Sequence, residues 1–167
     1  MANKRKVMDQ LVIEDAKLIF KNFSGKEGKY NPAGRRNFCV LLDDEISKQL
    51  EKDGWNIRYL PAREEGEPDA PYLQVSVSFD KYPPRCVLIS NGNKTLLTEE
   101  DVSLIDFADI ENVDIMLNPY NWEVSNKRGV KAYLKSIYVT LKDDALEAKY
   151  YQVATSAKSA IVEEVDD

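Results

Sequence analysis

The feature that most constrains the fold of this chain is a change of parity within its last apolar segment, residues 130–141. The apolar side chains occupy even positions from Val130 to Leu134 and odd positions from Ile137 to Leu141. Because a β-strand turns alternate residues to opposite faces, one strand can bury all of them only if an extra residue is inserted near Lys135-Ser136. Such a β-bulge bends and twists a strand, which favours a small, strongly curved sheet.

The remaining segments predict several short strands and one or two short helices. Tyr72–Phe79 is the clearest strand, because its apolar and polar residues alternate strictly. Further strands are expected over Leu11–Phe20, Arg36–Leu42, Trp55–Tyr59, Cys86–Ile89 and Val113–Val124, and helices over Asp43–Gly54 and Thr98–Ala108. Turns are expected at residues 22–34, at Asn91-Gly92 and at Ser125–Gly129, and Phe20 and Phe38 are expected in the core. The pattern is that of a mainly β protein, an OB-fold-like five-stranded curved barrel.

The length of 167 residues fits one domain with its own core. We expect this domain over residues 10–152, preceded by a basic N-terminal extension over residues 1–9 and followed by a flexible acidic tail over residues 153–167. No apolar run approaches the ~20 residues that span a bilayer, and no apolar stretch follows the basic start. We therefore expect no membrane segment and no secretory signal.

The chain contains no histidine, which removes the Ser-His and Cys-His nucleophile pairs and histidine as a metal ligand. The two cysteines, Cys39 and Cys86, lie in apolar segments and are predicted to be buried, reduced thiols of a cytoplasmic protein. These absences predict a protein that is not an enzyme and that uses no cofactor and no metal.

Charge is unevenly distributed along the chain, although the net value is -6. Residues 1–36 carry nine Lys or Arg against four Asp or Glu, and residues 117–142 carry five against one. The middle of the chain and its end are acidic. Because salt screens charges beyond about 8–10 Å, the local field around the basic segments decides whether a polyanion binds.

Aromatic residues are interleaved with the cations in both basic segments. Sequence-independent binding of single-stranded DNA needs this combination, since cations follow the phosphates and rings stack on the unpaired bases. The candidate nucleic-acid-binding residues are Lys21, Phe23, Lys26, Lys29, Tyr30, Arg35, Arg36, Tyr120, Trp122, Lys127, Arg128, Lys131, Tyr133 and Lys135.

The acidic tail ends in Glu163, Glu164, Asp166 and Asp167. It is either a solubilising end, or an arm that imitates DNA in the binding groove or recruits basic partners. Two other functions stay open. One is an acidic protein-interaction or DNA-mimic module, and the other is a metal-dependent nuclease built on Asp106, Asp109, Glu111 and Asp114.

Short motifs spread over residues 10–142 also favour single-stranded DNA binding. They are Asn22-Phe-Ser-Gly25, Tyr30-Asn31 with Gly34-Arg35 and Asn37-Phe38, Asp53-Gly-Trp55, Pro71-Tyr-Leu73, Pro119-Tyr-Asn-Trp122 and the run from Gly129 to Leu141. Together they resemble phage-encoded single-stranded DNA-binding proteins of the OB type. The resemblance implies protection of single strands during phage DNA replication, recombination and repair in the host cytoplasm. It also implies an acidic tail that contacts replication or recombination proteins, although such tails often end in an aromatic residue and this one ends in Asp167. It leaves the oligomeric state open.

Overall fold

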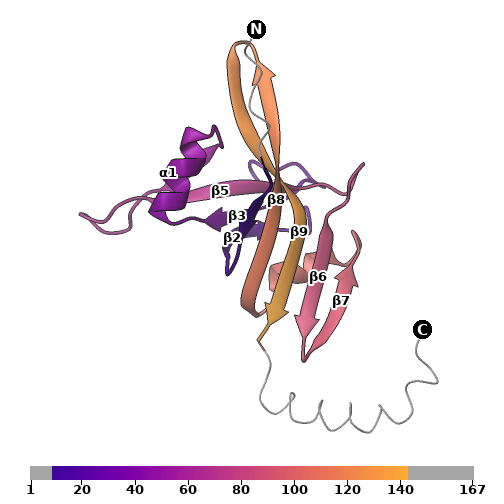
Figure 1. Ribbon diagram of the computed structural model, residues 1–167. Helices are drawn as coiled ribbons and strands as arrows, with labels where there is room; N and C mark the ends of the chain where they lie inside the picture. Colours follow the sequence, from indigo (N-terminus) through magenta and orange to yellow (C-terminus); the bar gives the residue numbers. More distant parts are fainter. Residues whose placement is uncertain (1–8, 143–167) are drawn as a thin grey trace, which may run out of the picture.

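The computed structural model describes residues 9–142, and most of them lie in β-strands (Figure 1). The elements are β1 (Leu11–Ile13), β2 (Lys17–Asn22), β3 (Arg36–Leu41), α1 (Asp44–Lys52), β4 (Ile57–Leu60), β5 (Ala70–Val77), β6 (Arg85–Ser90), β7 (Asn93–Leu97), the 3-10 helix η1 (Val102–Phe107), β8 (Ile110–Val124) and β9 (Lys127–Leu141). The expected acidic tail lies outside the described residues, as does the expected N-terminal extension except for Asp9.

The sheet curls into a five-stranded barrel of the OB type. β2, β3 and β5 form an antiparallel meander, β5 pairs in parallel with β9, and β9 pairs antiparallel with β8. The N-terminal strand joins the two ends, because β1 pairs with β8 while β2 pairs with β3. The predicted fold class is therefore confirmed.

The predicted bulge in the last strand is present. Leu134 faces Leu117 and Ser136 faces Met116, so Lys135 has no partner across the β8–β9 ladder. Apolar residues on both sides of the bulge are buried, and Lys135 is exposed. The bulge divides β9 into a first half that pairs with β5 and a second half that pairs with β6.

The expected strand over Leu11–Phe20 is divided into β1 and β2. Asp15 has a φ of 51°, and its N–H donates a hydrogen bond of 2.9 Å to the Asp114 carboxylate on β8. A second irregularity in β2 gives Phe20 a φ of 51° and turns its ring outward, with 62% of the residue exposed. The assignment of Phe20 to the core was wrong, because the local irregularity reverses the alternation that supported it.

The other predicted elements are present with shifted ends, and the second predicted helix is of a different type. The first helix is capped by the Asp43 carboxylate, which accepts a hydrogen bond from the Ile46 N–H, and it stops before Gly54, whose φ is 96°. The second helix is a 3-10 turn over Val102–Phe107. The loop expected at Ser125–Gly129 is a two-residue turn, Ser125-Asn126, so β9 starts at Lys127.

The core fills the barrel with side chains from every strand of the meander and from β8 and β9. Phe38, Val75, Leu117 and Ile137 are among its fully buried members. Both cysteines are free and buried, as predicted. Burial raises the pKa of the Cys39 thiol to about 11 and that of Cys86 to about 12, so both remain protonated at neutral pH.

Candidate nucleic-acid interface

The outward sides of β4, β5, β8 and β9 form one continuous face. Strand register places Tyr120 opposite Lys131 and Ser76 beside Tyr133, with all four side chains pointing away from the core. Beyond the barrel, β8 and β9 continue as a hairpin that projects from the body (Figure 1). We call this surface the groove face; its members are Arg35, Asn56, Arg58, Gln74, Ser76, Tyr120, Trp122, Lys131 and Tyr133.

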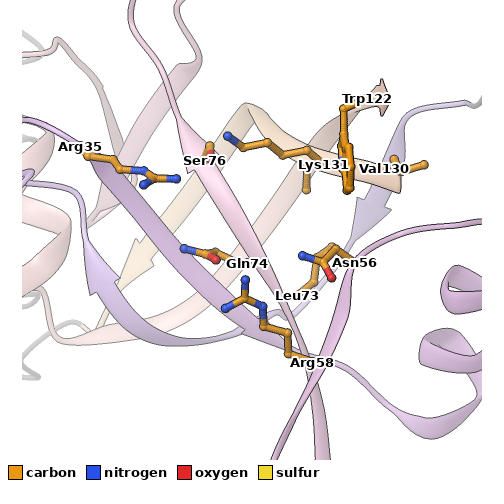
Figure 2. Close-up of a pocket in the computed structure, with 10 residues that line it drawn as sticks. Arg35, Asn56, Arg58, Leu73, Gln74, Ser76, Trp122, Val130 and Lys131 are labelled. Carbon is orange, nitrogen blue, oxygen red and sulfur yellow. The ribbon is translucent and has the colours of Figure 1, made fainter. Parts of the chain in front are cut away.

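A pocket of about 240 Å³ lies in the groove face where β5 and β9 diverge. Arg35, Arg58 and Lys131 reach it from three different parts of the chain, and Trp122 forms one wall (Figure 2). Leu73, Val130 and Ala132 also line it, together with the polar residues Asn56, Gln74 and Ser76. None of the described residues that line this pocket is acidic, so its field favours an anion.

Aromatic rings continue the groove face beside the pocket. Tyr120 and Tyr133 contact each other edge to face, with 5.9 Å between ring centroids, and the Lys131 ammonium lies 5.1 Å from the Tyr133 ring centroid. On the other side, Tyr72 faces Arg58 across β4–β5 and contacts the exposed Phe20 ring. Cations and ring faces are therefore close together on one surface, which is the arrangement that single-stranded DNA requires.

Hydrogen bonds from Asn31 organise the basic loop between β2 and β3. Its amide nitrogen donates to the carbonyls of Lys26 and Arg35 at 3.0 and 2.9 Å, and its amide oxygen accepts from Asn37 at 2.8 Å. The backbone of Arg35, which precedes β3, is fixed by this contact. Asn31 thus positions one of the three pocket cations.

Five further predicted residues lie on the strands of the groove face or on the 23–35 loop without lining the pocket. Lys127 lies on the same side of the hairpin as Trp122, and Lys135 is exposed at the bulge. Lys26, Lys29 and Tyr30 are exposed on the 23–35 loop, and the Lys29 ammonium lies 5.4 Å from the Tyr30 ring centroid.

Phe23 is a correction to the predicted site. Its side chain is fully buried and stacked on Phe38, with 5.0 Å between ring centroids and 16° between ring planes. Its N–H donates to the Asp106 carboxylate at 2.7 Å, which ties the segment to η1. A ring without exposed surface cannot stack on a base, so Phe23 belongs to the core.

Three predicted cations are directed away from the groove face. Arg36 points to the core side of β3, where it pairs with Glu99 at 2.9 Å and lies over Phe79. The Lys21 ammonium donates to the Ile105 carbonyl in η1. Arg128 lies on the opposite side of the hairpin from Trp122, 3.8 Å from Glu123. Each has an intramolecular partner that a phosphate would have to replace.

Sequence reasoning missed Arg58, Asn56, Gln74 and Ser76. Arg58 lies in the acidic middle of the chain, outside the two basic segments from which the candidate residues were chosen. A signal was nevertheless present, because the alternation of Trp55, Ile57 and Tyr59 turns Arg58 to the other side of its strand. Burial raises the pKa of the Cys39 thiol, and the nearby positive charge of Arg58 partly offsets this effect.

The carboxylates considered for a nuclease have separate structural contacts. Asp106 accepts from the N–H groups of Phe23 and Ser24, Asp114 accepts from Asp15, and Asp109 pairs with Lys142. Within residues 9–142, no group of three or more His, Cys, Asp or Glu side chains could hold a metal ion.

Comparison with known families identifies the chain. The family described as "Putative phage ssDNA-binding domain" matches residues 1–167, the whole sequence. The chain belongs to this phage ssDNA-binding family. No curated protein matches the sequence.

Two solved structures of a bacteriophage Enc34 protein share the fold of this phage ssDNA-binding domain. The single-stranded DNA-binding protein from bacteriophage Enc34, in complex with ssDNA, superposes with a TM-score of 0.53 and 9% identity over 81% of this chain and 88% of that one. Its C-terminally truncated form superposes with a TM-score of 0.52 and 9% identity, over 81% of this chain and 87% of that one. A single-stranded DNA-binding protein encoded by bacteriophage T7 gives a TM-score of 0.39 at 16% identity, over 82% of this chain and 94% of that one.

Among residues 9–142, neither helix has the length and hydropathy of a membrane span.

Proposed function

We propose that this phage ssDNA-binding domain binds single-stranded DNA through the groove face, without sequence preference. Binding there would protect single strands during phage DNA replication, recombination and repair in the host cytoplasm. The observation that carries the proposal is the convergence of Arg35, Arg58 and Lys131 on a pocket walled by Trp122, next to the Tyr120–Tyr133 pair. Phosphates would lie against the cations, and bases would stack on the rings.

The proposal includes no catalytic step, because the groove face offers cations, amides and rings rather than a nucleophile with an adjacent base. The nuclease alternative predicts cleavage of single-stranded DNA in magnesium that Asp114→Ala abolishes. An intact oligonucleotide after prolonged incubation supports a binding protein.

The direct test is a fluorescence titration with an oligopyrimidine strand and with its duplex, each at two salt concentrations. Quenching by the single strand should exceed quenching by the duplex, and affinity should fall with salt because each phosphate contact releases counterions. An acidic interaction module would show no affinity for either form at low salt. That outcome would refute the proposed function.

Tyr133→Ala should weaken binding of single-stranded DNA by fivefold or more, since loss of one base–ring stack costs about 1–3 kcal/mol. Tyr133→Phe retains the ring and should bind like the parent chain. Tyr82→Ala is the matched control, because Tyr82 is 88% exposed and lies outside the groove face. Equal affinities for the two alanine variants would remove Tyr133 from the interface.

We also propose that the acidic tail competes with DNA for the groove face, or recruits basic replication and recombination proteins. Its residues Glu163, Glu164, Asp166 and Asp167 lie outside the described residues, so this proposal rests on charge alone. Deletion of the residues after Ala157 should tighten DNA binding at low salt and have little effect at high salt, where competition is screened. An unchanged dissociation constant at low salt would eliminate competition and leave recruitment.

A further inference from the structure

Trp122 has an unusual neighbour across the β8–β9 hairpin. The register places it directly opposite Gly129, and both side-chain positions belong to the side of the hairpin that carries the groove face. Figure 2 shows the indole edge-on beside Val130 and Lys131, at the end of the pocket.

The indole lies against the backbone of Gly129. A Cβ atom at position 129 would come within 2.8 Å of Cζ2 and 2.9 Å of Cε2 and Nε1 of Trp122. These three atoms form one edge of a rigid bicyclic ring, so they cannot yield as the end of a flexible side chain would. Gly129 is itself buried. This edge of the indole is therefore packed against the strand.

The backbone does not explain the glycine. Gly25, Gly34, Gly54, Gly66 and Gly92 have positive φ angles, but Gly129 does not. An ordinary residue could adopt its conformation, and glycine inside a strand costs stability. The glycine is instead explained by the Trp122 indole, which occupies the space that a Cβ atom at position 129 would need.

We propose that Gly129 is a positioning residue for DNA binding. By omitting a side chain, it lets the Nε1–Cζ2 edge of Trp122 pack against β9, which fixes the ring beside the pocket where a base can stack on it. A ring held in place before binding loses less conformational freedom when a base stacks on it. This inference rests on the proposed function.

The test is a double-mutant cycle of Gly129→Ala and Trp122→Ala, read as affinity for an oligothymidine strand. Gly129→Ala should lower affinity about fivefold in the parent chain, the lower end of the effect of one lost stack. In the Trp122→Ala background, where no ring remains to be displaced, it should change affinity less than twofold. The slope of affinity against salt should stay unchanged, because no phosphate contact is removed.

Two controls separate positioning from a general effect on the fold. Gly28→Ala is the matched substitution, because a Cβ there meets no atom within 4 Å and its φ is not positive; it should leave affinity unchanged. If Gly129→Ala destabilises the hairpin, the double variant should recover the unfolding midpoint of Trp122→Ala alone, since the clash is gone. In a Trp55→Phe background, Trp122 is the remaining tryptophan and reports its own quenching by DNA.

The outcomes are distinct. Parent-like affinity of Gly129→Ala, or an equal loss in both backgrounds, would overturn the positioning role while leaving the proposed function intact. Failure of the parent chain to bind the strand would instead refute the proposed function itself.

Discussion

The triple variant Arg35→Ala/Arg58→Ala/Lys131→Ala should lose affinity for single-stranded DNA by on the order of 100-fold at low salt. These three cations converge on the pocket of the groove face. Taking about 1 kcal/mol for each partly exposed contact, the combined loss is about 3 kcal/mol. The slope of log affinity against log salt should become shallower by about 2, because each phosphate contact contributes about 0.7 on a single strand.

A variant with the same change in net charge controls for long-range attraction. Lys48→Ala/Lys52→Ala/Lys81→Ala removes three exposed cations from α1 and from the segment after β5, outside the groove face. It should retain most of the affinity, since distant exposed charges are screened at moderate salt. Equal losses in the two triple variants would mean that overall charge, and not the groove face, drives binding.

Phe23→Ala should destabilise the fold by about 3–5 kcal/mol, the usual cost of removing a buried phenylalanine side chain. Phe23 is fully buried and stacked on Phe38. In a chain of this size, the melting temperature should fall by roughly 10 °C. Where the variant remains folded, its affinity for DNA should stay within about twofold of the parent, because the ring has no surface to offer.

Tyr30→Ala is the matched control for Phe23→Ala, because Tyr30 is an aromatic residue of the same loop and is 86% exposed. Its substitution should change stability by less than about 0.5 kcal/mol. Thermal unfolding followed by circular dichroism measures both variants. A stable Phe23→Ala protein with weakened DNA binding would reverse the assignment of Phe23 to the core.

The barrel was predictable because its signals are local. The parity change around Lys135 required a bulge, and the bulge is there. Strict alternation from Tyr72 to Phe79 identified β5, and Asp43 and Gly54 limited α1. In each case, neighbouring residues in the sequence carry the whole constraint.

The site was predicted less completely, because its geometry depends on contacts between distant segments. Phe23 and Tyr30 lie in the same glycine-rich segment. Phe23 is buried because it packs against Phe38, whereas Tyr30 is exposed. Arg58 joins the pocket only because β4 pairs with β5, which brings it to the same face as Gln74. Composition identifies the kinds of residue in an interface, whereas strand pairing decides which of them meet.

Photochemical cross-linking of a bound oligothymidine strand, followed by peptide mapping, tests the location of the interface most directly. Unpaired bases stacked on the groove face should cross-link to peptides that contain Tyr120, Trp122 and Tyr133. Tyr82 and Phe107, which are 88% and 85% exposed on other parts of the molecule, serve as internal references and should remain unmodified. Cross-links concentrated at Tyr82 or Phe107, with the groove-face peptides unmodified, would contradict this account.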